Sequence, residues 1–287
     1  MKPNGRVAIR KMYKLYINGA FARSESGRSD QIDGENVAHA SRKDVRDAVV
    51  AARTAYAKWA AQSPALRGLV LYRLAEMMEA RKAELAEQLV IGGTVKDNEA
   101  KREVAAAIDR AVWYAGWCDK YLALASTRNP VAGPHFNFST PEPTGVVALL
   151  APNKPALLGL VTAVLPALVS GNAVVVVAGE RDPRSAIVFA ECLATSDLPA
   201  GTANVLTGTR AELGPVLAAH MDVNALGAFG LDPDAEKRLG ELAAENVKRT
   251  RFEDAPARDA WFADTYDDIE RVLAFTELKT IWHPARI

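Results

Sequence analysis

The first part of the chain contains three stretches in which apolar residues recur every three or four positions. The first begins at Ser41-Arg-Lys-Asp44, which has the spacing of a capping box, and the second begins at Ser63-Pro64, an N-cap and a first helical position. The third runs from about residue 98 to residue 124. The apolar positions are Val45, Val49, Ala52, Tyr56 and Trp59 in the first stretch, Leu71, Leu74, Met78 and Leu85 in the second, and Val104, Ile108, Ala111, Ala115, Cys118 and Leu122 in the third. This periodicity predicts three amphipathic helices packed against another layer.

The pattern changes at residue 145, after which short apolar runs alternate with helix-length segments. Four runs have the length of buried strands, at residues 145–151, 173–177, 203–206 and 225–229. Such alternation predicts parallel strands joined by right-handed crossovers. The expected fold class is therefore α/β, with a doubly wound, Rossmann-like and mainly parallel sheet after the N-terminal helices.

Two segments follow neither rhythm. A proline-rich passage surrounds the alternating segment His135-Phe-Asn-Phe-Ser139, which predicts an extended arm or edge strand. The last block, residues 254–287, has no alternation of strands and helices, but its residues 275–282 are rich in strand formers with a two-residue period. We expect this second segment to pair with the first.

Composition excludes several classes of protein. Hydrophobic residues make up 49% and charged residues 24%, as in soluble globular proteins, and 35 basic residues balance 35 acidic ones, so the surface as a whole lacks a field that would hold nucleic acid or anionic lipid. Residues 1–14 carry five basic side chains and no acid, which we interpret as a loose arm. The uncharged run at 155–179 is interrupted by Pro166 and by Gly171-Asn172, which favours a buried helix and strand over a membrane span. No nucleic-acid or membrane partner is expected.

The chain offers few residues for metal or thiol chemistry. With only Cys118 and Cys192, it can build neither a disulfide framework nor a thiolate zinc site, which fits a reducing, cytoplasmic setting. Both cysteines lie in helical patterns, so we expect small buried packing groups rather than nucleophiles. The histidines, which lie far apart without the spacing of metal ligands, are His39, His135, His220 and His283. No metal site is predicted.

Several blocks, taken together, resemble the aldehyde dehydrogenase superfamily. They are Tyr16-Ile-Asn-Gly19, Pro143-Thr-Gly-Val-Val-Ala, the segments 165–175 and 197–208, and His220-Met-Asp-Val223. The resemblance implies a cofactor domain for NAD(P), a cysteine nucleophile, an asparagine that stabilises the oxyanion, and a glutamate base. It also implies that the segments 128–142 and 274–287 form an oligomerisation arm.

The catalytic positions of that family are altered here. Its cysteine lies in a catalytic domain beyond the position of Glu253, and the 34 residues after Glu253 contain no cysteine. The family's Pro-Trp-Asn-Phe-Pro block becomes Pro152-Asn-Lys-Pro-Ala156, which puts Lys154 at the oxyanion position, or Asn153 after a one-residue shift. Glu253 stands at the position of the base, but Asp254-Ala-Pro256 replaces Leu-Gly-Gly, which favours a plain surface or loop carboxylate. We therefore expect vestigial catalytic positions and no active site.

The cofactor-binding positions implied by the resemblance are Glu180, Gly208 and Gly230, and they too are weakened. In the family's "KPAE" block Glu180 is kept, but Val177 replaces the lysine that binds ribose in the family. In the "FTGS" block Asp232 and Pro233 form a helix start, with Asp234 and Glu236 in the first turn. These carboxylates take the electrostatic role that a pyrophosphate would have at a helix N-terminus. No cofactor is expected, or only weak binding of NAD or NADP.

The expected organisation follows from the resemblance: a loose basic arm (1–14), the N-terminal strand and helices of the cofactor-type domain (15–127), an extended oligomerisation strand (128–142), the Rossmann-like part (143–253), and a linker with a C-terminal oligomerisation strand (254–287). The chain resembles a truncated, cysteine-less member, similar to the degenerate second module of two-module aldehyde dehydrogenases, with the catalytic domain absent.

Two functions remain open from the sequence. The first is a non-catalytic subunit, or pseudoenzyme, with an assembly or regulatory role. The alternative is an NAD(P)-dependent oxidoreductase component that needs a catalytic domain from a partner chain. In either case the expected partner is a second copy or a full-length aldehyde dehydrogenase, bound through residues 128–142 and 274–287.

Overall fold

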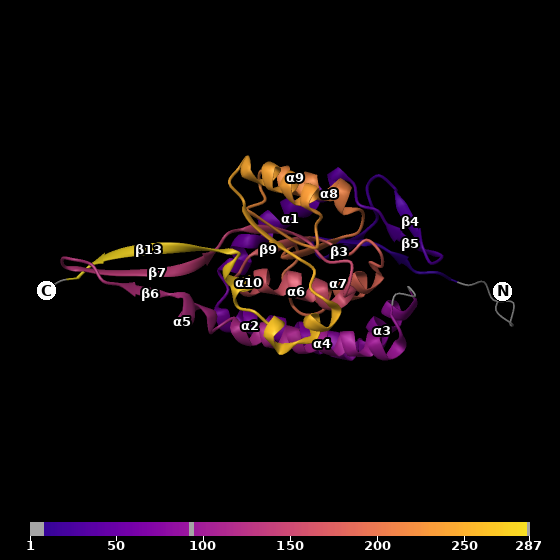
Figure 1. The fold of residues 1–287 in the computed structure, drawn as a ribbon, viewed down its shortest axis with the longest axis horizontal. Helices are drawn as coiled ribbons and strands as arrows, with labels where there is room; N and C mark the ends of the chain where they lie inside the picture. The colour runs from indigo at the N-terminus through magenta and orange to yellow at the C-terminus, as the bar shows by residue number, and fades with distance from the viewer. Residues whose placement is uncertain (1–8, 92–94, 286–287) are drawn as a thin grey trace.

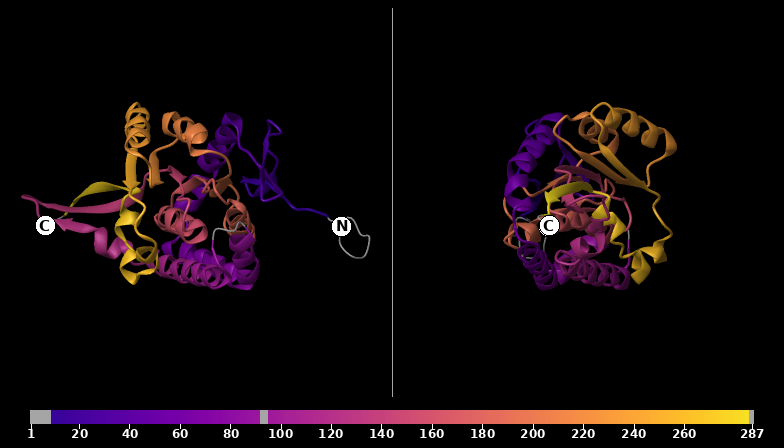
Figure 2. Two further views of the ribbon diagram at one scale, coloured as in Figure 1. Left: turned by 45° about the vertical axis from the view of Figure 1, so that its right-hand side comes forward. Right: turned by 90° about the vertical axis from the view of Figure 1, so that its left-hand side faces the viewer.

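The computed structural model describes residues 9–91 and 95–285. Most of the predicted basic arm, residues 1–8, lies outside the described residues, as do 92–94 and 286–287. An α/β body with helices on both faces of a central sheet carries a flat β arm that projects from one side (Figure 1). Figure 2 shows the same arm from two further directions.

The central sheet confirms the predicted doubly wound, mainly parallel architecture. Its strand order is β12-β11-β8-β9-β10-β2-β3, in which the first five strands are parallel and β2 runs antiparallel to β10. The strands are β12 (Arg249–Glu253), β11 (Ala225–Phe229), β8 (Val146–Leu150), β9 (Ala173–Val177), β10 (Ala203–Leu206), β2 (Leu15–Ile17) and β3 (Ala20–Ala22). Strand β12 was not among the predicted strands, because its sequence Arg-Thr-Arg-Phe-Glu lacks an apolar run.

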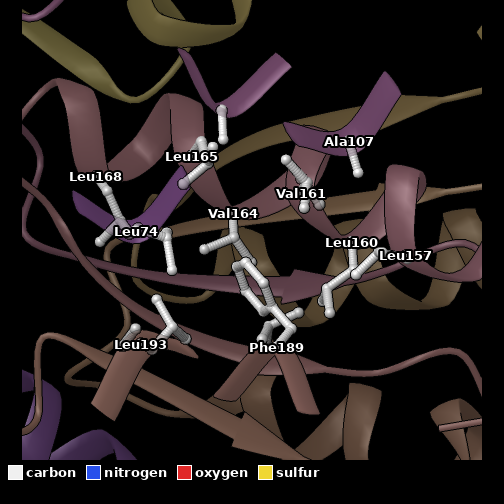
Figure 3. Packing of buried hydrophobic residues seen from close by; sticks show 14 of the residues in the cluster. Leu74, Ala107, Leu157, Leu160, Val161, Val164, Leu165, Leu168, Phe189 and Leu193 are labelled. Atoms are coloured by element: carbon white, nitrogen blue, oxygen red, sulfur yellow. The ribbon is translucent and has the colours of Figure 1, made fainter. Parts of the chain in front are cut away.

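Helices cover both faces of this sheet, as Figure 1 shows. One face carries α1 (Arg42–Ala60), α8 (Arg210–Ala219) and α9 (Pro233–Ala244). The other carries α6 (Ala156–Val169) and α7 (Arg184–Ala194), backed by α2 (Pro64–Ala80), α3 (Lys82–Ile91) and α4 (Asp97–Trp117). Helix α6 is buried almost all round, since it lies between the sheet and this outer layer. Figure 3 shows Val164 of α6 close to Phe189 of α7, with Leu74 of α2 and Ala107 of α4 in the same cluster.

The predicted helix starts are correct, whereas two helices are shorter than predicted. Ser41 and Asp44 form a reciprocal capping box at α1, and Ser63 caps α2 ahead of Pro64. The second predicted helix breaks at Arg81 into α2 and α3, so that α3 packs on α4 and α7. The third ends at Trp117 and is followed by the short α5 (Tyr121–Ala125). No glycine or proline lies at the first break, whereas Gly116 stands in the last turn before the second.

The arm is a three-stranded antiparallel sheet of β13 (Thr276–Pro284), β7 (His135–Pro143) and β6 (Thr127–Asn129). Strands β7 and β13 pair along their whole length, from Thr276 opposite Pro143 to Pro284 opposite His135. The pairing expected from the alternation is therefore present, and β7 is longer than the segment 135–139. A second small sheet, which was not predicted, joins β1 (Met12–Tyr13), β5 (Glu35–Ala38) and β4 (Ser29–Ile32).

Residues 254–275, which we call the strap, pack onto the body. The strap contains two 3-10 turns, η1 (Arg258–Phe262) and η2 (Asp264–Tyr266), and the helical turn α10 (Glu270–Leu273). Trp261 is 1% exposed, and its ring lies 5.6 Å from that of Phe229 at the end of β11. The buried Arg110 guanidinium of α4 donates to Asp267 (2.5 Å) and to the Trp261 carbonyl (2.8 Å). The strap thus contributes Trp261, Val272 and Phe275 to the core.

Within the described ranges, no helix combines the length and the apolar composition needed to cross a bilayer. The uncharged run 155–179 folds as α6 and β9. No group of three or more potential metal-ligating side chains occurs in the same ranges.

We expect Trp261→Ala to lower the free energy of unfolding by about 3–5 kcal/mol, because it removes a fully buried ring and leaves a cavity under the strap. The control is Trp282→Ala on the arm, whose side chain is 59% exposed and whose loss should change stability by about 0.5 kcal/mol or less. Urea unfolding of both variants checks this, and equal effects would contradict the core role of the strap.

Candidate functional site

The candidate site lies where the strand order of the sheet reverses. From β8 the chain proceeds to β9 and β10 on one side, whereas β11 and β12 lie on the other side. In open α/β sheets, ligands bind in the crevice at the carboxyl ends of the two strands that flank such a point. Here a cavity of about 420 Å³ opens beside Leu150, the last residue of β8, and is bordered by the first turns of α8 and α9. We call this cavity the cleft.

A guanidinium occupies the inner end of the cleft. Arg210, the first residue of α8, donates from Nη1 to the Phe229 carbonyl (3.0 Å) and from Nη2 to the Ala151 carbonyl. Phe229 is the last residue of β11, and Ala151 follows the last residue of β8. The side chain of Arg210 therefore bridges the ends of the two strands at the reversal point. Burial lowers the pKa of Arg210, and its Nε has no hydrogen-bond partner among the described residues. The cation is therefore held chiefly by backbone oxygens.

Glu180, which the resemblance places at the cofactor ribose, accepts a backbone N–H at the N-terminus of α8. Its carboxylate accepts the backbone N–H of Arg210, and its own N–H donates to Oδ1 of Asn153 (2.8 Å). Asn153, one of the two candidates for the oxyanion position, thus positions the loop that carries Glu180. Both residues make contacts within the chain that compete with a ligand for the same polar atoms.

The backbone conformation and the close neighbours of the two glycines predicted at the cofactor site favour glycine at both positions. Gly208 has φ +146, and a Cβ there would lie 3.0 Å from Leu213 Cδ1. Gly230 has φ +61, and a Cβ there would lie 3.1 Å from the Cβ of Ala255 at the start of the strap. Their presence is therefore explained without a ligand.

The N-terminus of α9 is closed as the sequence predicts. Asp232 accepts the N–H of Ala235 (2.8 Å), Pro233 is the first helical residue, and Asp234 and Glu236 lie in the first turn. The charged residues that line the cleft are three acids and two arginines, namely Glu180, Asp232, Asp234, Arg210 and Arg238. A dianionic pyrophosphate would meet a lining with an excess of negative charge and two helix ends that are already capped.

Lys154, the other candidate for the oxyanion position, lies outside the cleft. It borders a separate cavity of about 210 Å³ together with Trp261 and Arg258 of the strap and Glu103 of α4. Glu103 is 3% exposed and accepts the N–H groups of Leu157 (2.8 Å) and Leu158 (3.3 Å) at the start of α6. Burial raises the pKa of Glu103 above its ordinary value, although these two hydrogen bonds oppose the rise. The sequence analysis missed Glu103, for which the only signal is an acid beside the apolar positions of its helix.

Glu253 is not the plain surface or loop carboxylate that the sequence favours. It ends β12, its side chain is 18% exposed, and it accepts hydrogen bonds from Arg271 (2.7 Å) and Arg251 (2.8 Å). Burial acts to raise the pKa of Glu253, but the hydrogen bonds from the two guanidinium groups outweigh it and leave the pKa below 4.5. A carboxylate held in this way ties the strap to β12 and is poorly suited to accept a proton at neutral pH.

The two thiols are remote from this chemistry. Cys118 and Cys192 are both fully buried, and burial raises the pKa of each to about 12. The description "cysteine-less" is wrong for the chain as a whole, since it has two cysteines, although none follows Glu253. Neither thiol lines the cleft.

The structure brings Glu180 and Gly230 to the lining of the cleft, with Asn153 one hydrogen bond from Glu180 and the Glu253 carbonyl accepting the Gly230 N–H (2.8 Å). Neither Lys154 nor Glu253 lines the cleft, and Lys154 borders the second cavity together with Asn153. The residue that sequence reasoning missed at the centre is Arg210. A cation in the first turn of a helix is electrostatically unfavourable, and this was the one available signal.

Comparisons with known proteins agree with this architecture. The sequence pattern of the aldehyde dehydrogenase family matches residues 28–279. DhaS of Bacillus subtilis, named as a candidate aldehyde dehydrogenase, is 34% identical over 84% of this chain and 50% of its own length. Cytosolic 10-formyltetrahydrofolate dehydrogenase of Xenopus laevis is 31% identical over 88% of this chain and 29% of its own length.

Among solved structures, the NAD+ complex of an aldehyde dehydrogenase from Bacillus cereus superposes with a TM-score of 0.80 at 26% identity, covering 85% of this chain and 51% of that one. PnpE from Pseudomonas sp. WBC-3 gives 0.78 at 29% identity, covering 84% and 50%. The chain thus spans about half the length of DhaS and of these two structures, and less than a third of the Xenopus protein.

We expect Glu253→Gln to lower the free energy of unfolding at neutral pH by about 2 kcal/mol, somewhat less than the loss of a fully buried ion pair because part of the side chain is exposed. The folded-state pKa of Glu253 lies below 4.5, so its contribution is complete above that pH and is lost as the pH falls below it.

The difference between the wild type and Glu253→Gln should therefore be smaller at an acidic pH below 4.5 than at neutral pH. Urea unfolding at both pH values checks this, with Glu277→Gln, an exposed acid 3.6 Å from Arg249, as the control that should change little. A pH-independent difference would show that the charge of Glu253 has no role.

Proposed function

The chain belongs to the aldehyde dehydrogenase family, and from that premise we propose that it acts as a non-catalytic subunit with an assembly or regulatory role. The observation that carries the proposal is the cleft, in which Arg210 bridges the ends of β8 and β11 and the chain's own carboxylates accept an N–H group at both helix starts. The likeness to a degenerate second module of two-module dehydrogenases is part of the same proposal.

The thiols support this assignment. Oxidation of an aldehyde through a covalent intermediate requires a thiolate near the carbonyl, and the reactive form of a cysteine is the thiolate. Cys118 and Cys192 have pKa values near 12 and lie in the helical core, away from the cleft. Neither can act as the nucleophile without unfolding its surroundings.

The cleft residues do not fit NAD held as a pyrophosphate at a helix end. The relative from Bacillus cereus forms a complex with NAD+. In this chain one N–H group at each helix start already has a carboxylate acceptor: Glu180 accepts that of Arg210 at α8, and Asp232 accepts that of Ala235 at α9. Binding would require these carboxylates to move while Arg210 stays bound to two carbonyls, so we expect it to be weak.

The alternative, an oxidoreductase component completed by a partner's catalytic domain, is less well supported. Such a domain would have to approach the carboxyl ends of β11 and β12, where substrate and cofactor would meet. The strap already covers this place, with Trp261 against Phe229 and with Arg271 bound to Glu253. A partner would have to displace a segment that is part of the core.

We expect the purified chain to show no oxidation of aldehydes with NAD or NADP, measured as absorbance of the reduced cofactor over a panel of aliphatic and aromatic aldehydes. The variants Cys118→Ala and Cys192→Ala serve as controls. Turnover that disappears in either variant would contradict the proposal, whereas a trace that persists in both identifies a contaminating enzyme.

We also expect NAD and NADP to bind weakly, with dissociation constants of about 1 mM or higher. This corresponds to a binding free energy of about 4 kcal/mol or less. Calorimetry on the wild type and on Arg210→Ala checks this. A low-micromolar dissociation constant for the wild type that is lost in Arg210→Ala would mean that this guanidinium receives the phosphates, and the closed-cleft reading would be wrong.

A further inference from the structure

A buried histidine lies between two carboxylates in a part of the body that the proposed function does not use. His39 follows β5 and is 6% exposed. Its Nδ1 lies 2.7 Å from Oδ2 of Asp30 in β4, and its Nε2 lies 3.1 Å from Oε2 of Glu212 in the first turn of α8. Figure 1 shows β4 and β5 at the end of the body opposite the arm. The ring therefore bridges β4 and α8.

Each ring nitrogen faces an oxygen that, when ionised, can only accept a hydrogen bond. A neutral imidazole has one N–H and one nitrogen with a lone pair, so it can donate to one carboxylate only. The imidazolium donates from both nitrogens, and both bonds are then charge-assisted. Hydrogen bonds from the Arg28 guanidinium lower the pKa of Glu212 to about 2, while burial opposes the shift, so this carboxylate stays ionised in weak acid. The complete bridge thus requires the protonated ring.

The charged groups of this cluster come from three places in the fold. Asp30 comes from β4 and Glu212 from α8, and Arg28, just before β4, donates to both oxygens of Glu212 (2.7 and 2.9 Å). The loop between β10 and α8 adds no charge: a Cβ at Gly208 would lie 3.4 Å from Cδ2 of His39. Within the described part of the chain, no basic side chain forms a hydrogen bond or an ion pair with the ring. The ring therefore meets two acids, with one guanidinium behind the second.

The rest of the β4–β5 hairpin is attached by contacts without a histidine. At its tip, Asp33 accepts from Nη2 of Arg184 (3.0 Å), and after β5 the N–H of Ala40 donates to the Thr207 carbonyl (2.7 Å). Histidine is the side chain whose charge ordinarily changes between pH 5 and 8. A change in the charge of His39 therefore leaves the tip and β5 attached and acts on the contact of β4 with α8.

We propose that His39 is a proton-dependent latch that holds β4 to the first turn of α8. When the ring gives one proton to solvent, a single N–H remains. Whichever nitrogen keeps it, the bridge from Asp30 to Glu212 breaks at the other nitrogen, because a lone pair then faces a carboxylate. Protonation restores both bonds. The latch goes beyond the proposed assembly role and does not depend on it, and it acts on the helix start that also carries Arg210 of the cleft.

The test is amide hydrogen exchange of the full chain at about pH 5 and about pH 8, expressed as protection factors that remove the intrinsic effect of pH on exchange. We expect the protection of residues 28–38 to fall about tenfold at the higher pH, the equivalent of one hydrogen bond to a charged group. Protection of α1 should not change. His39→Gln can donate but cannot become a cation, so its protection should be low at both pH values. The control His283→Gln, which removes an exposed histidine of the arm, should respond as the wild type does.

A second variant keeps the test decisive if His39→Gln does not fold. Asp30→Asn changes a half-exposed side chain and leaves the buried ring in place. An asparagine amide can pair with either form of the ring, because it offers both an acceptor and a donor, so the pH response should disappear. A tenfold response that persists in Asp30→Asn or in His39→Gln would overturn the latch. Equal protection of the wild-type hairpin at both pH values would overturn it as well.

Discussion

A half-buried guanidinium at the reversal point of the sheet decides which polar atoms of the cleft remain available. Arg210 spans the carboxyl ends of β8 and β11, which in an open α/β sheet is the place where the backbone diverges and a ligand can enter. A cation there loses hydration, and two carbonyl oxygens and the nearby Glu180 carboxylate compensate for part of that loss. Since the same contacts cap α8, the cleft and the first turn of the helix are closed together.

The carboxyl-terminal strap is likewise held by charged side chains with partners inside the chain. Glu253 at the end of β12 binds Arg271, and Arg110 from α4 binds Asp267 and the Trp261 carbonyl, so buried charges on either side of the strap are paired. At the root of the arm, the buried Asn172 side chain donates to the Phe275 carbonyl (2.8 Å) and accepts the Gly145 N–H (2.8 Å). Removing one partner of such a contact leaves a buried polar group unsatisfied, which costs more than the net gain of the bond. Strap, arm and sheet therefore form one cooperative unit.

The arm differs from the body because its edge strand leaves backbone N–H and C=O groups without strand partners. The body buries its strands on both faces, whereas β13 exposes a full row of backbone groups and two large apolar side chains. At the cleft, polar atoms of Arg210, Glu180 and Asp232 already have partners within the chain, whereas the edge of the arm offers hydrogen bonds to another strand. This contrast is why we propose a role in association rather than in catalysis.

Local sequence determined the elements whose signals are local. The capping residues Ser41 and Asp232, the apolar strands from 146 to 229, and the alternation of 275–282 each specify their structure within a few residues, because hydrogen bonding of caps and two-residue periodicity are short-range effects. Family resemblance located Glu180 and Glu253, but not their partners. Arg210 and Arg271 could not be assigned from the sequence, since each meets its partners across a separation that only packing closes. Likewise, the break at Arg81, the polar strand β12 and the burial of Trp261 depend on neighbours distant in the chain, and tertiary structure alone decided them.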